Sequence, residues 1–189
     1  MGRWLIAAAL SAAVLLGQDF KLGAKVDEFT VRDAAGASVP FSSLRGPVTV
    51  VTFVSVQCPV SNSYNERMNA IYKEYSGRGV KFVFINANHS ESAEEVFAHA
   101  RDHFAFPVYR DENNVVADRF GAGVTPEAYV IDSAGVVRYH GSIDDSQELR
   151  RVQEPRLRNA LDAVLAGKTP ERAETKAFGC SIKRVKKES

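Results

Sequence analysis

The stretch Val48-Thr-Val-Val-Thr-Phe-Val-Ser-Val56, followed by Gln57-Cys-Pro-Val-Ser61, decides the fold of this chain. Its first nine residues are almost continuously apolar, which is typical of a strand buried on both faces of a helix-covered sheet. The run ends at Cys58 and Pro59, and apolar residues then recur at helical spacing as far as Tyr75. Proline is favoured at the first position of a helix. We therefore predict that Cys58 lies where a central strand passes into a helix.

The predicted position of Cys58 has a chemical consequence. At the start of a helix, the sulfur faces unpaired backbone N–H groups and the positive end of the helix dipole. Both favour the thiolate, which is the reactive form of cysteine. The alternative is a small buried apolar side chain, a role that free cysteine often has. The junction favours reactivity, so the sequence predicts thiol redox chemistry at Cys58.

The first 17 residues have the layout of a signal peptide. Arg3 is followed by an uncharged stretch from Trp4 to Gly17, which is shorter than the roughly 20 residues that a membrane-spanning helix needs. We predict that residues 1–17 are removed, that the protein is exported to a periplasmic or extracellular compartment, and that it is not stably inserted in a membrane afterwards. The alternatives are an uncleaved anchor and a cytosolic protein with an apolar start.

Size and charge set further limits. The 189 residues give room for one domain with a sizeable core. The formal net charge is only +1, and no basic stripe is interleaved with aromatic residues, so nucleic acid is not expected as a partner. His99 and His103 are spaced to share a helix face but have no third ligand nearby, and we expect neither a metal nor another cofactor.

The remaining pattern predicts alternating strands and helices. A hairpin is predicted over residues 29–41, further strands over 80–85, 107–109, 127–132 and 136–140, and helices from Pro59, Ser92, Asn113 and Pro155. This order predicts an α/β fold with a mixed central sheet covered by helices on both faces. The domain is expected to span residues 22–167. Residues 168–189 are expected to form a polar, basic tail that carries Cys180.

Several blocks in this order resemble the thioredoxin fold. More narrowly, they resemble the redoxins, which are the peroxiredoxin-like branch of the thioredoxin superfamily. The relevant family is of the alkyl hydroperoxide reductase and thiol-specific antioxidant type. The blocks are Cys58-Pro-Val-Ser61, Phe84-Ile-Asn-Ala-Asn88, Val124-Thr-Pro126, Tyr139-His-Gly-Ser-Ile-Asp-Asp-Ser146 and Phe178-Gly-Cys-Ser-Ile-Lys183. The similarity covers residues 22 to 184. It implies a three-layer, thioredoxin-like domain with a redox-active centre.

The resemblance also assigns roles to individual residues. Cys58 matches the reactive cysteine of the family. Ser61 stands where a thioredoxin has its second cysteine, and a serine can donate a hydrogen bond to a thiolate but cannot form a disulfide. Pro126 matches a loop proline that is cis in this superfamily. It would lie beside the reactive sulfur and leave the Thr125 backbone free to pair with an extended substrate.

The departures from the family are equally informative. Thr52 replaces the buried acid that thioredoxins carry six residues before the reactive cysteine. Peroxiredoxins have a proline seven residues before the peroxidatic cysteine and a threonine or serine three residues before it. Here Val51 replaces the proline, and Ser55 retains the hydroxyl. The arginine of peroxiredoxins would fall near Pro126 and is missing, so activation of a peroxide should be weaker.

The sequence leaves three functions open. The first is an exported thiol–disulfide oxidoreductase that acts on protein or small-molecule disulfides and is regenerated by an external thiol. The second is a peroxiredoxin-like peroxidase in which a peroxide oxidises Cys58. The third is a non-catalytic binding module that uses the groove at Thr125 and Pro126.

The sequence also leaves the role of Cys180 open. It lies 122 residues after Cys58, and a flexible tail can reach many places. Cys180 is therefore a candidate resolving cysteine, a structural staple for the tail, or an unpaired mobile thiol.

Overall fold

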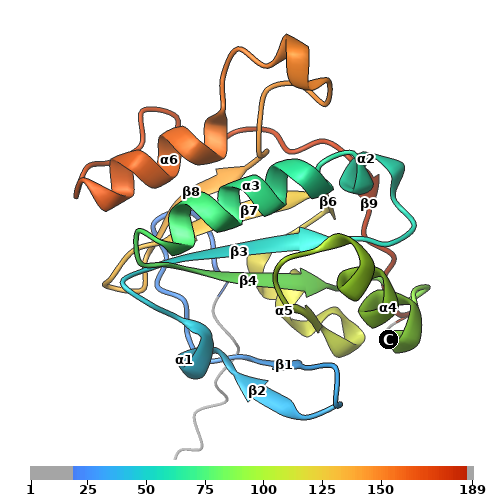
Figure 1. The fold of residues 1–189 in the computed structure, drawn as a ribbon. Coiled ribbons are helices and arrows are strands. Elements are labelled where there is room, and N and C mark those ends of the chain that lie inside the picture. Colours follow the sequence, from blue (N-terminus) through green and yellow to red (C-terminus); the bar gives the residue numbers. More distant parts are fainter. Residues whose placement is uncertain (1–18, 187–189) are drawn as a thin grey trace, which may run out of the picture.

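The computed structural model describes residues 19–186, so the predicted signal peptide lies outside the described residues. The main sheet has seven strands in the order β2-β1-β5-β4-β3-β7-β8 (Figure 1). The strands are β1 (Thr30–Arg32), β2 (Ser38–Pro40), β3 (Val48–Val54), β4 (Val80–Asn86), β5 (Val108–Arg110), β7 (Glu127–Ile131) and β8 (Val137–Gly141). β3 pairs parallel with β4 and antiparallel with β7, which confirms the mixed sheet.

The central strand β3 is buried along its whole length. Successive side chains of a strand point to opposite faces. Accordingly Val50 and Val54 join one apolar cluster, while Val51 and Phe53 join another on the opposite face of the sheet. Burying each of these side chains contributes roughly 1.5–3 kcal/mol. The continuous apolar run is therefore explained by a strand that has a layer of helices on each side.

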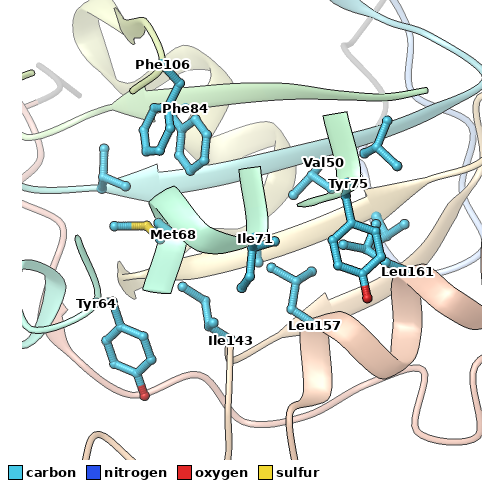
Figure 2. Close-up of a cluster of buried hydrophobic side chains, with 14 of the residues drawn as sticks. Val50, Tyr64, Met68, Ile71, Tyr75, Phe84, Phe106, Ile143, Leu157 and Leu161 are labelled. Atoms are coloured by element: carbon cyan, nitrogen blue, oxygen red, sulfur yellow. The ribbon is translucent and has the colours of Figure 1, made fainter. Parts of the chain in front are cut away.

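Helices supply both layers. One cluster contains side chains of α3 (Asn65–Ser76), α4 (Ala93–His103) and α6 (Arg156–Leu165), and Figure 2 shows Met68, Ile71 and Leu161 among them. The other cluster contains Phe41 of α1 (Phe41–Leu44) and side chains of α5 (Val115–Phe120). The 3-10 turns η1 (Glu112–Asn114) and η2 (Leu149–Arg151) complete the described helical elements. Within residues 19–186, no helix is long and apolar enough to cross a membrane.

The helix predicted from Pro59 is interrupted. It consists of α2 (Pro59–Asn62) and α3, which begins at Asn65. Polar groups tighten the chain between them: the Ser63 hydroxyl donates to the Val60 carbonyl at 2.7 Å, and the Tyr64 N–H donates to the Ser61 carbonyl at 3.0 Å. Such short-range bonds compete with continued α-helix. The interruption leaves Cys58 on a short, separate helical turn.

The chain after α6 returns across the domain. Its strand β9 (Cys180–Ser181) pairs with β6 (Val124–Thr125) in a second sheet of two strands, and Figure 1 shows β9 beside β6 and α2. Before β9, the His140 N–H donates to the Ala173 carbonyl at 2.9 Å. Residues 173–185 are therefore bound to the domain through their backbone. The division at residue 167 stays a prediction.

Candidate redox-active site

Cys58 lies at the predicted junction of strand and helix. It is the residue that precedes α2, and its sulfur accepts a hydrogen bond from the Ser61 N–H at 3.3 Å. The residue is only 1% exposed. A sulfur that accepts a backbone N–H is suited to carry negative charge. The expectation of a sulfur placed at a helix start is confirmed.

Cys58 forms a disulfide with Cys180. The two Cα atoms are 5.7 Å apart, within the usual range for a disulfide. Residues 19–186 contain no free cysteine, so in this state Cys180 is not the unpaired mobile thiol that the sequence left open. Cys180 is partly exposed, whereas Cys58 is buried. Of the two cysteines, Cys180 is therefore the more exposed residue.

The loop with Pro126 lies directly against this disulfide. The Thr125–Pro126 bond is cis, as expected from the resemblance. The Thr125 carbonyl oxygen lies 3.3 Å from the Cys58 sulfur. The expectation that the Thr125 backbone is free is wrong for this state, because Thr125 pairs with Cys180 of β9. The chain's own C-terminal strand occupies the position expected for an extended substrate.

The two serines act on the backbone around Cys58. The Ser55 hydroxyl accepts a hydrogen bond from the Cys58 N–H at 3.1 Å. The Ser61 hydroxyl accepts from the Ser55 N–H at 3.1 Å, so its contact with the sulfur comes through its backbone N–H. Both side chains are buried. Both serines predicted for the site therefore lie beside Cys58 and fix the loop that presents its sulfur.

A buried carboxylate that sequence reasoning missed lies under this loop. Glu91 is 2% exposed. It accepts hydrogen bonds from the Ser55 hydroxyl at 2.5 Å, from the N–H groups of Val56 and Gln57 at 2.9 and 3.0 Å, and from the Asn86 amide. Four donors compensate the cost of burying the charge. In the sequence Glu91 is only one more polar residue before the helix cap at Ser92, so no local signal marks it.

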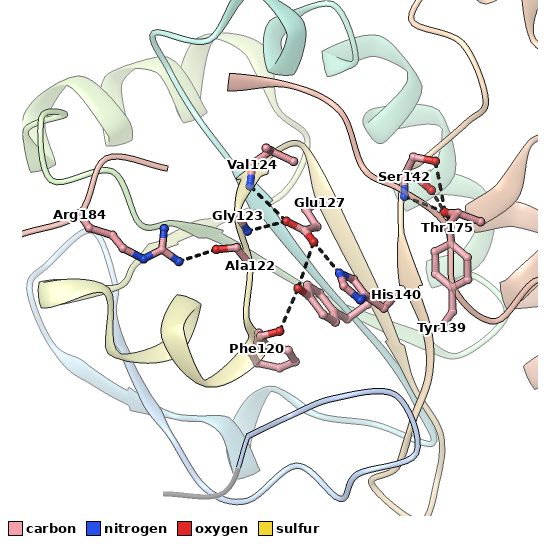
Figure 3. Close-up of polar contacts among 11 residues, drawn as sticks. Phe120, Ala122, Gly123, Val124, Glu127, Tyr139, His140, Ser142, Thr175 and Arg184 are labelled. Carbon is pink, nitrogen blue, oxygen red and sulfur yellow. Dashed lines mark hydrogen bonds and ion pairs between the residues drawn. The ribbon is translucent and has the colours of Figure 1, made fainter. Parts of the chain in front are cut away.

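A second buried carboxylate follows the cis proline. Glu127 accepts hydrogen bonds from the Gly123 and Val124 N–H groups at 2.8 and 3.2 Å, and its other oxygen lies 2.5 Å from His140 Nε2 (Figure 3). Burial raises the pKa of Glu127, but the bonds from His140 and from these backbone groups outweigh it and hold the pKa below its usual value. The carboxylate fixes the backbone at Gly123 and Val124, where β6 begins. A negatively charged side chain therefore directly follows Pro126, whereas peroxiredoxins have an arginine near this position.

Comparison with known proteins agrees with this geometry. The model of the AhpC/TSA family matches residues 22–140. The chain belongs to the AhpC/TSA family. Part of this AhpC/TSA chain is similar to a thiol-disulfide oxidoreductase ResA of Bacillus cereus, with 25% identity over 120 residues that make up 64% of this chain and 69% of that protein.

Similar solved structures identify the fold. A hypothetical protein from Sinorhizobium meliloti 1021 superposes with a TM-score of 0.80 at 30% identity, covering 89% of this chain and 97% of the other. The peroxidoxin BcpB from Mycobacterium tuberculosis superposes with a TM-score of 0.60 at 20% identity, covering 78% of this chain and 97% of that chain. The AhpC/TSA chain therefore has the thioredoxin-like fold that its sequence predicts.

Proposed function

We propose that this chain is an exported thiol–disulfide oxidoreductase whose redox-active pair is Cys58 and Cys180. The observation that carries the proposal is the disulfide between these residues, which lies against the cis proline loop. The similarity to a protein named thiol-disulfide oxidoreductase supports a thiol-dependent oxidoreductase activity. Export is proposed from the layout of residues 1–17.

In the oxidising half of the cycle, the Cys58 thiolate attacks one sulfur of a substrate disulfide. A mixed disulfide forms, and the other substrate sulfur leaves with the electron pair of the broken bond. The Cys180 thiolate then attacks the Cys58 sulfur, which releases the reduced substrate and forms the internal disulfide. Ser55 and Ser61 hold the Cys58 loop in place, and Thr125 and Pro126 form the edge to which a substrate docks.

In the regenerating half of the cycle, an external thiolate attacks the internal disulfide. We expect the attack at the sulfur of Cys180, since Cys180 is partly exposed and Cys58 is buried. Attack there gives a mixed disulfide on Cys180 and frees Cys58 as a thiolate that accepts the Ser61 N–H. A second thiol then attacks the external sulfur, so two thiols leave as a disulfide and both cysteines are reduced. The physiological partners are accordingly disulfides and a thiol reductant.

The proposal is tested with the reduced chain from residue 18 onward and its Cys180→Ser variant. Each is mixed with one equivalent of a small disulfide and analysed by mass spectrometry without reduction. We expect the wild-type chain to form the internal disulfide and Cys180→Ser to accumulate a mixed disulfide on Cys58. A Cys58 that reacts no faster than a free thiol of similar pKa would contradict the oxidoreductase, and would leave the groove at Thr125 and Pro126 as a binding surface.

A peroxidase is the second candidate function, and the burial of Cys58 favours it. Cys58 is only 1% exposed, and a buried residue is reached more easily by a small peroxide than by a protein disulfide. The Cys58 thiolate would attack one oxygen of the peroxide, the O–O bond would break, and the other oxygen would leave as an alcohol or as water. The Cys180 thiol would then condense with the Cys58 sulfenic acid to give the disulfide and a molecule of water. Stopped-flow rates with hydrogen peroxide and with a peptide disulfide separate the two functions. A faster reaction with peroxide supports the peroxidase, and a faster reaction with the disulfide supports the oxidoreductase.

A further inference from the structure

The strand β9 occupies the very edge at which the proposed function places a substrate. Thr125 pairs with Cys180 and Val124 with Ser181, and the Ile182 N–H donates to the Gly123 carbonyl at 3.0 Å. Antiparallel addition to an exposed strand is a common way for a protein to bind an extended peptide. The segment around Cys180 is therefore bound as a peptide ligand would be, with its cysteine sulfur against Cys58.

The contacts that hold this segment do not depend on the disulfide. Ile182 is 5% exposed and belongs to the apolar cluster beneath the sheet. The Lys183 N–H donates to Asn88 Oδ1 at 2.9 Å, and the Lys183 carbonyl accepts from the His89 N–H at 2.8 Å. The Val185 N–H donates to Asn114 Oδ1 at 2.8 Å. None of these contacts involves sulfur, so reduction of the disulfide does not by itself remove them.

The fit at Gly179 limits what can occupy the edge. A Cβ atom at this position would lie 1.9 Å from the Thr125 carbonyl oxygen and 2.7 Å from the Thr125 carbonyl carbon. Both atoms belong to the backbone and cannot turn aside as the end of a side chain can. A residue larger than glycine before the cysteine must therefore push the peptide away from β6.

We propose that the edge of β6 is a binding site for an extended peptide with glycine immediately before its cysteine and an aliphatic residue two positions after it. The resident ligand of this site is the chain's own Gly179-Cys-Ser-Ile182 segment. A competing peptide disulfide reaches Cys58 only after this segment has detached. The inference rests on the proposed function, because it takes Cys58 as the attacking thiolate.

The test uses the reduced Cys180→Ser chain and two peptides, Phe-Gly-Cys-Ser-Ile-Lys and Phe-Ala-Cys-Ser-Ile-Lys, each as a mixed disulfide with thionitrobenzoate. The Cys58 thiolate attacks the peptide sulfur, and thionitrobenzoate leaves with the bonding electrons and is followed by its absorbance. Adding Gly179→Ala to the chain should speed the reaction with the glycine peptide about tenfold, because the resident strand is displaced. On that variant, the alanine peptide should react about tenfold more slowly than the glycine peptide.

The matched control is Gly77→Ala, added to the same Cys180→Ser chain. Gly77 follows α3 with ordinary helical angles, and a Cβ there meets only the Glu74 carbonyl oxygen at 3.8 Å. This control should leave both peptide rates unchanged. Hydrogen exchange of the Ile182 amide verifies that Gly179→Ala detaches β9. Ile182→Ser, which removes the apolar anchor instead, replaces Gly179→Ala if the latter does not fold.

Two results would overturn the inference. One is equal rates for the glycine and alanine peptides, and the other is a peptide rate that does not rise although exchange shows β9 detached. Bis(2-hydroxyethyl) disulfide, which has no peptide backbone, separates this failure from that of the proposed function. If Cys58 reacts with this disulfide but does not discriminate between the peptides, only the peptide site is wrong. If Cys58 is inert toward all three probes, the proposed function fails and the peptide site fails with it.

Discussion

The two halves of the redox pair are held in different ways. Cys58 follows a strand that is buried along its whole length, and its loop is held by hydrogen bonds to Glu91 and Ser55. Cys180 lies on a two-residue strand at an edge and is held by Ile182 and a few backbone hydrogen bonds. One cysteine therefore belongs to the folded core, whereas the other lies on a short edge strand, the kind of element that opens at a lower free energy than the core.

Breaking the disulfide, which joins these two differently held regions, should have the largest effect on the free energy of unfolding. The bond closes a loop of 122 residues, for which chain entropy predicts a stabilisation of about 5 kcal/mol. Urea unfolding of the oxidised and reduced wild-type chain should differ by about this free energy. In Cys180→Ser, a reducing agent should change nothing. An equal shift in that variant would mean that the reductant, and not loss of the bond, destabilises the protein.

Removing the carboxylate under the Cys58 loop should have the next largest effect. Glu91→Ala leaves the N–H groups of Val56 and Gln57 and the Ser55 hydroxyl without their buried acceptor, at a cost of about 3 kcal/mol in the free energy of unfolding. The exposed Glu94 is the control, and Glu94→Ala should change that free energy by less than about 0.5 kcal/mol. Similar losses in both variants would show that Glu91 does not support the loop.

A smaller, pH-dependent effect is expected at the β6 edge. The pKa of Glu127 is lowered in the folded state by His140 and the β6 backbone, against the opposing effect of burial. A lowered pKa gives stability that is present above the unfolded value and is lost as the pH falls through the folded one. The free-energy difference between wild type and Glu127→Gln should thus shrink as the pH falls below 4.5. A difference that stays constant down to acid unfolding would exclude this contribution.

The smallest effect is expected at the surface of the C-terminal segment. Arg184 forms an ion pair with Asp118 at 2.8 Å, and both side chains are about one-third exposed. Such pairs contribute about 0.2–1 kcal/mol. Arg184→Ala should therefore lower the free energy of unfolding by no more than this, and less at high salt. A loss as large as that of Glu91→Ala would mean that the segment is as firmly held as the Cys58 loop.

The local parts of this structure could be predicted from the sequence. The apolar run that ends at Cys58 predicted the central strand and its junction with a helix. A helix was also predicted from Ser92, and Ser92 is the N-cap of α4 and forms a capping box with Glu95. The resemblance added the cis bond before Pro126. These features depend on neighbouring residues or on a short motif, so a single stretch of sequence contains the information.

The long-range parts could not be predicted. Glu91 reaches residues more than 30 positions away, and in the sequence a buried acid looks like an exposed one. The segment 168–186 has the polar composition of a tail, yet Ile182 inserts into the core and Cys180 and Ser181 pair with β6. The pairing of Cys58 with Cys180 depends on that register, which no local periodicity encodes.

The distance of Cys180 from Cys58 along the chain also imposes an order on biosynthesis. A nascent chain that has been synthesised as far as α6 contains every strand of the seven-stranded sheet but not yet Cys180. During that interval Cys58 has no cysteine in its own chain with which to form a disulfide. The protein therefore acquires its two-cysteine chemistry only when β9 has been made, after its main sheet is complete.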